Sequence, residues 1–250
     1  MNILNYRNFI NELVNNQDVL INKIDYTLLS QEATEEDIRN LCTNADRLGV
    51  KSVCVLPKMV SIAKECLLDS DVLVCTVVSF PDGANSIEEK INETNKVISD
   101  GADEVDMVMN YQYLLQNRDE YDTRILLEEV ESLVDICHKN NKILKVIVES
   151  GNLNSDQTKI VTDICIEAGA DFIKTSTGRK GIAGAELDKI KIMRDVISIR
   201  GSNMMIKASG GIRNIDDIQK FEKYVDRFGI GYLAVDNIFG NKEKIIGDLY

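Results

Sequence analysis

Two lysines and an aspartate are candidates for chemistry, because each falls within or at the end of a short apolar run. Lys174 ends the run in "DFIKTSTGRKGIAG", where three hydroxyl residues and a glycine follow it at once. Lys207 lies in "MMIKASGG", and Asp106 lies inside "EVDMVMN". A buried charged side chain is costly unless it is paired or used. These residues therefore indicate either a buried ion-pair network or a reactive site.

Two lysines close together favour one kind of chemistry. A neighbouring ammonium and desolvation both disfavour protonation of an amine, and they can lower a lysine pKa to roughly 7–8. A neutral amine attacks aldehydes and ketones to give a Schiff base, whose protonated form permits cleavage or formation of the adjacent carbon–carbon bond. A carboxylate such as Asp106 could move the hydroxyl and Cα protons, directly or through water. We therefore expect aldol chemistry on a lysine.

Metal and thiol chemistry have little support in the sequence. The single histidine, His138, lies in "ICHKNNKILK" near the end of an expected helix, so a His-rich zinc site is nearly excluded. Cys54 lacks a histidine partner, which favours a small core or site-lining thiol over a nucleophile. We expect no metal and no cofactor.

The totals exclude several classes of protein. The 250 residues carry a formal net charge of −12, which gives no general support for binding to nucleic acid or to an anionic membrane. The six cysteines are scattered without a CxxC pair and are typical of a reduced, cytoplasmic protein. The N-terminus is too polar for a signal peptide, and no apolar run reaches the roughly 18 residues of a membrane span.

Eight short apolar runs alternate with segments of helical period, and this pattern predicts a (β/α)₈ TIM barrel. The runs cover residues 23–29, 52–57, 72–80, 104–110, 143–150, 171–177, 204–210 and 227–235. Three helical segments run from a capping residue to a glycine: Thr34 to Gly49, Ser86 to Gly101, and Ser155 to Gly169. A doubly wound open sheet is the alternative, but no GxGxxG turn follows the first strand. We expect residues 1–250 to form one domain, with an extra N-terminal helix in about the first twenty residues.

Barrel enzymes carry their chemistry at the C-terminal ends of the strands, and the polar residues fall there. The period of two along a strand turns Asp106, Lys174 and Lys207 inward. The fifth strand adds Lys145 and Glu149.

Glycines near the ends of the last strands suggest a phosphate site, because backbone N–H groups in these loops commonly hold phosphate. "SGGIRNIDD" leads from a strand into a helix capped by Asn214, with Arg213 beside it.

Four segments, in order, closely resemble the deoxyribose-phosphate aldolases: "GADEVDMVMN", "LKVIVESGNL", "AGADFIKTSTGR" and "IKASGGIR". Weaker matches at "IDYTLL", "SVCVLP" and "SFPDG" extend the resemblance to roughly residues 20–235. Members of that family are class I (Schiff-base) aldolases with a (β/α)₈ fold. The combination of "KTSTG" on the sixth strand with a lysine on the seventh is the specific part of the match.

The resemblance implies a role for each matching residue. Lys174 would form the Schiff base, Lys207 would disfavour its protonation, and Asp106 would act as acid and base with water. Thr27 and Cys54 would line the substrate site, with Asp25 behind them. Four residues would face the phosphate end of the substrate: Thr177, Gly178, Gly210 and Gly211.

The implied reaction is the reversible cleavage of 2-deoxy-D-ribose 5-phosphate into D-glyceraldehyde 3-phosphate and acetaldehyde. The partners would be these small aldehydes and sugar phosphates, with a homo-oligomer possible and a catabolic role in deoxyribonucleotide breakdown. A Schiff-base aldolase for an unphosphorylated or different aldose is the nearest alternative. A barrel that binds a sugar phosphate without turnover is the alternative from another class.

One segment departs from the family pattern. Small hydroxyl residues that bind phosphate are expected after the eighth strand, but "RFGIGYLAVDN" has Ile230, Gly231 and Tyr232 there. We expect the lost hydroxyls and the bulk of Ile230 to weaken phosphate recognition. The C-terminal Tyr250 resembles a tyrosine that aids proton transfer in some members, although a solvated terminus is the default.

Overall fold

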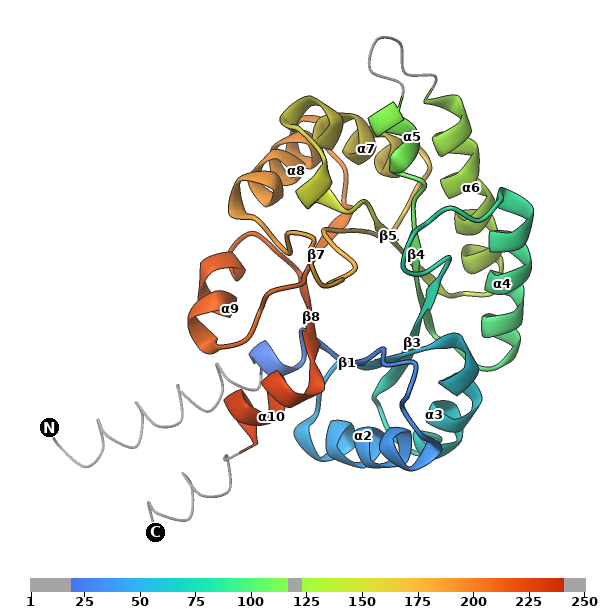
Figure 1. Cartoon of the computed structure of the whole chain (residues 1–250), viewed down its shortest axis with the longest axis vertical. Coiled ribbons are helices and arrows are strands. Elements are labelled where there is room, and N and C mark those ends of the chain that lie inside the picture. The colour runs from blue at the N-terminus through green and yellow to red at the C-terminus, as the bar shows by residue number, and fades with distance from the viewer. Residues whose placement is uncertain (1–18, 117–122, 241–250) are drawn as a thin grey trace, which may run out of the picture.

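Eight parallel strands close into a barrel in the computed structural model, which describes residues 19–116 and 123–240 (Figure 1). The strands pair in sequence order, and the eighth pairs with the first to close the sheet. They are β1 (Ile24–Leu28), β2 (Ser52–Val55), β3 (Leu73–Val78), β4 (Glu104–Val108), β5 (Ile143–Ile147), β6 (Phe172–Lys174), β7 (Met205–Ser209) and β8 (Arg227–Gly231). The expected TIM barrel is therefore confirmed.

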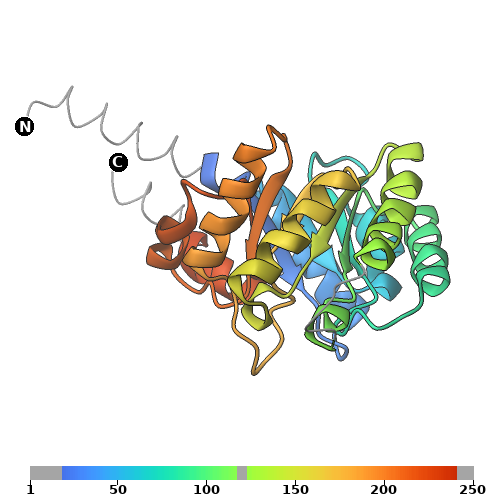
Figure 2. The same ribbon diagram turned by 90° about the horizontal axis from the view of Figure 1, so that it is seen from above.

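Helices form a ring outside the strands, as the two perpendicular views show (Figures 1 and 2). They are α2 (Glu35–Leu48), α3 (Val60–Cys66), α4 (Ile87–Ser99), α5 (Gln112–Gln116), α6 (Arg124–Lys139), α7 (Ser155–Glu167), α8 (Leu187–Ile199), α9 (Ile215–Phe221) and α10 (Tyr232–Phe239). Two short 3₁₀ turns, η1 (Pro57–Met59) and η2 (Ser150–Asn152), follow β2 and β5. Because helices cover the outside of the sheet, the outward residues of the strands, such as Val105 and Met107, are fully buried.

The helix starts follow from local capping chemistry. The Thr34 hydroxyl accepts the Asp37 N–H while the Asp37 carboxylate accepts the Thr34 N–H, so α2 begins at the predicted cap. The predicted cap of α7 was one residue late. Asn154, not Ser155, is the N-cap. Its side-chain oxygen accepts a hydrogen bond from the Gln157 N–H, and Oε1 of Gln157 accepts one from the Asn154 N–H.

An aspartate just before each of three strands ties that strand to the one before it. Asp103, Asp171 and Asp226 precede β4, β6 and β8. Their carboxylates accept the N–H groups of Val74, Leu144 and Ile206 at 3.1, 2.8 and 2.8 Å, respectively. Each bond links the beginnings of two neighbouring strands, so these aspartates help to fix the strand register on which the barrel interior depends.

The eighth strand is shorter than the sequence pattern predicts. The chain leaves the sheet after Gly231, and the predicted strand residues 232–235 form the first turn of α10. Ile230 pairs with Tyr26 of β1 in the register and is buried in the core between strands and helices. The expectation that Ile230 adds bulk to the substrate site was therefore wrong, because the period of two turns Gly229 inward instead.

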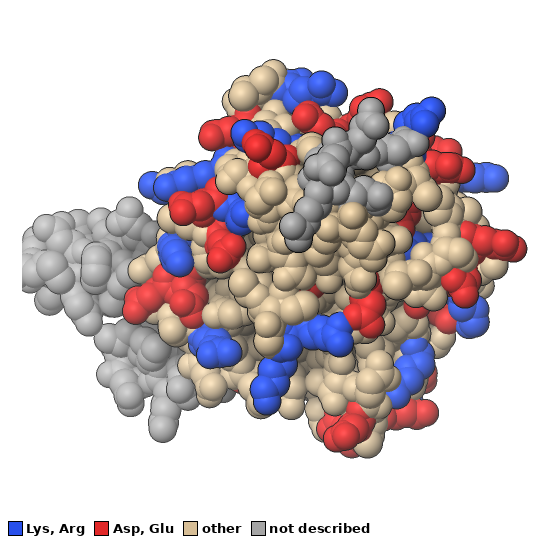
Figure 3. All heavy atoms as spheres, turned by 45° about the horizontal axis from the view of Figure 1, so that its top comes forward, with Lys and Arg blue, Asp and Glu red and all other residues tan. Residues whose placement is uncertain are grey.

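Several expectations lie outside the described residues. The extra helix is expected in about the first twenty residues, and residues 1–18 lie outside the described part of the chain. Residues 19–21 are described and are helical. Tyr250 also lies outside, and one domain for residues 1–250 stays a prediction. Within the described ranges, no helix is both long and apolar enough to cross a bilayer. Acidic and basic side chains are mixed on the face drawn in Figure 3, and neither sign covers a large continuous area there.

The α7 cap gives a direct test of the fold. Asn154→Ala should lower the free energy of unfolding by about 1 kcal/mol, because the Gln157 N–H loses its acceptor at the helix start. Ser155→Ala is the matched control and should change it by less than about 0.5 kcal/mol. Denaturant unfolding of both variants decides the point. A larger loss for Ser155→Ala would contradict the assignment of the cap.

Candidate active site

Strand pairing brings the two predicted lysines side by side. Lys174 of β6 and Lys207 of β7 are register partners, which places their Cα atoms about 4.8 Å apart. Both side chains point into the barrel, where Lys207 is fully buried and Lys174 is 3% exposed. Lys174 ends its strand and lines the cavity above it, as expected for a residue at the C-terminal end of a barrel strand.

Asp106 of β4 holds the two lysines together. Its Oδ2 atom lies 2.7 Å from Nζ of Lys174 and 2.6 Å from Nζ of Lys207. Its Oδ1 atom accepts from Nζ of Lys145 at 2.9 Å and from Sγ of Cys75 at 3.2 Å. The three predicted catalytic residues therefore meet at one carboxylate, and Lys145 is a third lysine on the same group.

A second row of charges lies beneath this carboxylate. Asp25 contacts Lys207, accepts from Nη1 of Arg227 at 2.8 Å, and accepts from the Ser52 hydroxyl at 2.7 Å. Glu104 lies 2.5 Å from Nζ of Lys145 and accepts from Nη2 of Arg227 at 2.7 Å. These groups are buried, so the interior of the barrel is a connected ion-pair network rather than an apolar layer.

The network fixes the charge of its members. Burial lowers the pKa of Lys207, but the Asp106 and Asp25 carboxylates outweigh it and raise that pKa above its ordinary value. Burial raises the pKa of Asp106, but Lys145, Lys174 and Lys207 outweigh it and hold that pKa well below its ordinary value. Lys207 is therefore an ammonium and Asp106 a carboxylate at neutral pH.

The three lysines of the network differ in how many carboxylates they contact. Among the described residues, four cations and three carboxylates are joined by ion pairs, and Glu149 is a further buried carboxylate near Lys174. Lys174 is ion-paired to Asp106 alone in this part of the chain, whereas Lys207 also contacts Asp25. Lys174 therefore has the fewest ion-pair partners of the three lysines.

A cavity of about 610 Å³ opens above Lys174 at the C-terminal ends of the strands. Five of the expected substrate-binding residues line it: Thr27, Thr177, Gly178, Gly210 and Gly211. The loop from β6 to α8 reaches over the barrel opening (Figure 1). Asp25 lies beneath, fully buried, as the resemblance implies.

Cys54 lies deeper than expected. Its side chain is fully buried and belongs to a small apolar cluster inside the barrel with Leu56, Cys75 and Val77. Phe80 packs against this cluster and lines the cavity, whereas Cys54 does not. The structure thus differs from the expectation that Cys54 lines the substrate site.

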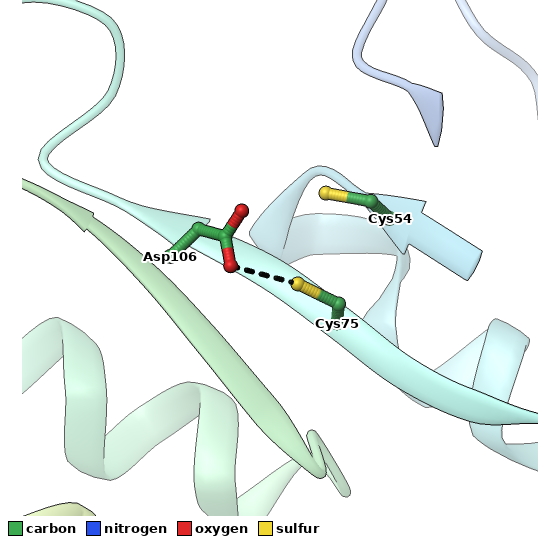
Figure 4. Close-up of side chains that lie close together, drawn as sticks. All are labelled: Cys54, Cys75 and Asp106. Atoms are coloured by element: carbon green, nitrogen blue, oxygen red, sulfur yellow. Dashed lines mark hydrogen bonds between the residues drawn. The ribbon is translucent and has the colours of Figure 1, made fainter. Parts of the chain in front are cut away.

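The ligand atoms of Cys54, Cys75 and Asp106 all lie within 4.8 Å of one another, a spacing that could hold a metal ion (Figure 4). Lys145 contacts both Sγ of Cys75, at 3.3 Å, and Oδ1 of Asp106. Lys174 and Lys207 contact the other carboxylate oxygen. Because ammonium groups already contact both oxygens of the Asp106 carboxylate, the arrangement favours the ion-pair network over a metal ion.

Sequence reasoning missed part of the network, although the period of two could have found it. Glu104 stands two residues before Asp106, and Arg227 stands two residues before Gly229, so both face the barrel interior. A Cβ atom on Gly229 would lie 3.0 Å from Cε of Lys207 and 3.0 Å from Cβ of Ser209, so these side chains would have to shift. The glycine thus leaves room for the Lys207 side chain, which extends toward Asp106 and Asp25.

Removing the third lysine should test the network. Lys145→Met should lower the free energy of unfolding at pH 7 by about 3–5 kcal/mol, because Glu104 and Asp106 lose a buried cation. The control Lys159→Met breaks an exposed pair with Asp156 and should cost at most about 1 kcal/mol.

The pH dependence of that loss has a definite sign. The folded-state pKa of Asp106 is depressed and that of Lys145 is raised, so their pairing stabilises the fold fully between the ordinary values of 3.8 and 10.5. The difference between Lys145→Met and the unmodified protein should therefore shrink as the pH falls below about 4. Denaturant titrations at pH 7 and below pH 4 measure this difference in the free energy of unfolding. A difference that stays constant with pH would contradict the account.

Comparison with known proteins places this site in a family. The model of the DeoC/LacD family aldolases matches residues 19–233. The deoxyribose-phosphate aldolase of Caldicellulosiruptor saccharolyticus is 46% identical over 209 residues, which cover 82% of this chain and 91% of that protein. The enzyme of the same name from Ureaplasma parvum serovar 3 is 43% identical over 198 residues, which cover 79% and 87%.

Solved structures agree with the sequence comparison. The tetrameric deoxyribose-phosphate aldolase of Aeropyrum pernix superposes with a TM-score of 0.79 at 29% identity, over 92% of this chain and 93% of that one. The family match spans every strand of the barrel and every residue of the ion-pair network. The chain belongs to the DeoC/LacD family of aldolases.

Proposed function

We propose that this protein is a deoxyribose-phosphate aldolase that works through a Schiff base on Lys174. The observation that carries the proposal is the amine of Lys174 at the floor of the cavity, paired with a carboxylate that it shares with the buried ammonium of Lys207. The names of the relatives support the substrate, 2-deoxy-D-ribose 5-phosphate. The products would be D-glyceraldehyde 3-phosphate and acetaldehyde.

The first half of the reaction forms an imine on Lys174. Lys174 passes a proton to Asp106, and its amine attacks the C1 carbonyl of the open-chain sugar to form a carbinolamine. Asp106 returns the proton to the carbinolamine hydroxyl, which leaves as water and gives a protonated imine. The positive charge of the imine then takes the place of the ammonium charge that Lys174 held. Lys207 stays charged throughout, because its two carboxylate partners hold its proton.

The second half breaks the C2–C3 bond. A base removes the proton of the C3 hydroxyl, the electrons of the C2–C3 bond move into the imine, and the aldehyde product leaves an enamine. Proton return to C2 and hydrolysis of the imine release acetaldehyde. Oδ2 of Asp106 is the base nearest to Lys174, and it loses an ammonium partner when Lys174 becomes an imine. We therefore assign these proton transfers to Asp106, directly or through water.

The phosphate end has backbone and guanidinium donors. Gly231 caps α10 without a side-chain hydrogen bond, and Gly231, Tyr232 and Leu233 line the cavity. The first N–H groups of a helix favour an anion. Arg213 and Arg179 also line the cavity, although Arg179 is paired with Asp82. These donors support a phosphate site without the missing side-chain hydroxyls.

An aldolase for an unphosphorylated or different aldose is the second candidate. The serine or threonine hydroxyls expected after β8 are absent from "RFGIGYLAVDN", and this observation favours it. The carbon–carbon chemistry at Lys174 would be the same in both cases, so only the substrate preference separates them.

A catabolic role in deoxyribonucleotide breakdown and a location in the cytoplasm remain part of the proposal. All six cysteines are free thiols, which supports a reducing compartment. A homo-oligomer also stays a prediction, which the tetrameric Aeropyrum pernix relative supports.

Reductive trapping tests the mechanism. Borohydride with acetaldehyde should add a two-carbon unit to Lys174, which peptide mass spectrometry can locate, and Lys174→Ala should abolish both the label and the cleavage activity while the fold is retained. A label on Lys207 would overturn the assignment. No label on any lysine would favour the barrel that binds a sugar phosphate without turnover.

Substrate preference tests the phosphate site. The protein should cleave the 5-phosphate with a higher kcat/KM than free deoxyribose, and Arg213→Met should lower that ratio by about tenfold, because a charged hydrogen-bond donor is lost. The rate on free deoxyribose should stay the same. An unmodified protein that cleaves both sugars equally well would favour the second candidate instead.

A further inference from the structure

A buried carboxylate beside the cavity has no part in the mechanism above. Glu149 follows β5 and is 1% exposed. Its backbone adopts the left-handed conformation, with φ 49° and ψ 54°, which is uncommon for residues other than glycine. Such a conformation persists only where its surroundings hold it, and these residues cluster at functional sites.

Both carboxylate oxygens of Glu149 are directed at one residue of the cavity wall. Oε2 accepts the hydroxyl proton of Thr177 at 2.5 Å, and Oε1 accepts the Thr177 N–H at 3.2 Å. The backbone beside them is fixed as well, since the Val148 and Ser150 N–H groups donate to the carbonyls of Lys174 and Thr175. Glu149 is thus held against the loop that carries the reactive lysine.

These contacts fix the direction of the hydrogen bonds that the Thr177 hydroxyl makes. A hydroxyl has one proton to donate and two lone pairs that accept. The proton goes to Glu149, and one lone pair accepts the Arg179 N–H at 3.2 Å. One lone pair is left for the cavity, which Thr177 lines. Burial raises the pKa of Glu149 above its ordinary value, against the hydrogen bonds from Thr177, which lower it. The ionised carboxylate only accepts hydrogen bonds, so it cannot reverse this arrangement.

We propose that Glu149 is a positioning residue that makes the Thr177 hydroxyl a hydrogen-bond acceptor toward the substrate, so that the site selects aldehydes that carry a hydroxyl donor near the carbonyl. This inference rests on the proposed function. It differs from the expectation that Thr177 faces the phosphate end, because a phosphate dianion has no proton to donate to an accepting hydroxyl. It separates substrates by chemistry: 2-deoxyaldoses carry such a hydroxyl, whereas acetaldehyde has none. A site that aims a buried acceptor at a substrate hydroxyl discriminates against analogues that lack it.

The test compares two reactions of the same variants. Glu149→Gln should lower kcat/KM for cleavage of 2-deoxyribose 5-phosphate by about tenfold or more, because a charge-assisted hydrogen bond is lost and an amide can turn the Thr177 proton toward the cavity. Borohydride trapping of acetaldehyde on Lys174 should keep its rate, since acetaldehyde makes no such contact. A general distortion of the Lys174 loop would instead slow both reactions.

Variants of the partner residue keep the test decisive even if Glu149→Gln folds poorly. Thr177→Val removes the hydroxyl at nearly constant volume and should cause a loss similar to that of Glu149→Gln. Thr177→Ser keeps the hydroxyl and should recover most of that loss. The double variant Glu149→Gln with Thr177→Val should be no worse than Thr177→Val alone, because both changes remove one interaction.

Three results would overturn the proposal: multiplied losses in the double variant, equal slowing of cleavage and acetaldehyde trapping, or full cleavage activity in Thr177→Val. A failure of the proposed function has a different signature, because the unmodified protein would then trap no acetaldehyde on Lys174. Intact trapping with unaffected Glu149→Gln and Thr177→Val variants would sink the role of Glu149 alone.

Discussion

One buried carboxylate, that of Asp106, organises the interior of this barrel. Three lysines from three strands converge on it, and a buried ammonium without such a partner would be unfavourable there. The second row of Asp25, Glu104 and Arg227 has a net charge of −1, which together with Asp106 offsets two of the three lysine charges. Lys174 has the fewest of these ion pairs and lines the cavity.

The fold supplies the positions that this network needs. Register pairs Lys174 with Lys207 and Asp106 with Lys145 on neighbouring strands, so the side chains meet without irregular backbone. Aspartates at the beginnings of β4, β6 and β8 help to set that register from the opposite end of the barrel. Gly229 leaves the space through which Lys207 passes. Small features far from the cavity thus determine the geometry of its floor.

The sequence was sufficient for the barrel and for the meeting of Lys174, Lys207 and Asp106, because eight apolar runs and a period of two define strands and faces. It was not sufficient where two structures fit the same letters. In "RFGIGYLAVDN" the apolar run continues from strand into helix, so the end of β8 and the outward turn of Ile230 were misjudged. The sequence also did not show how deep Cys54 lies inside the barrel. The period of two predicts which face of the strand it is on, but its distance from the cavity depends on the packing of the barrel interior.

In the proposed mechanism, the ammonium of Lys207 and the amine of Lys174 are electrostatically coupled through Asp106. The most direct measurement is the pH dependence of acetaldehyde trapping on Lys174 in the Lys207→Leu variant. Loss of the ammonium should favour protonation of the remaining amine, so the acid limb of the profile should move to higher pH by about one unit or more. An unchanged profile with a normal rate would show that the two amines act independently and would contradict the account.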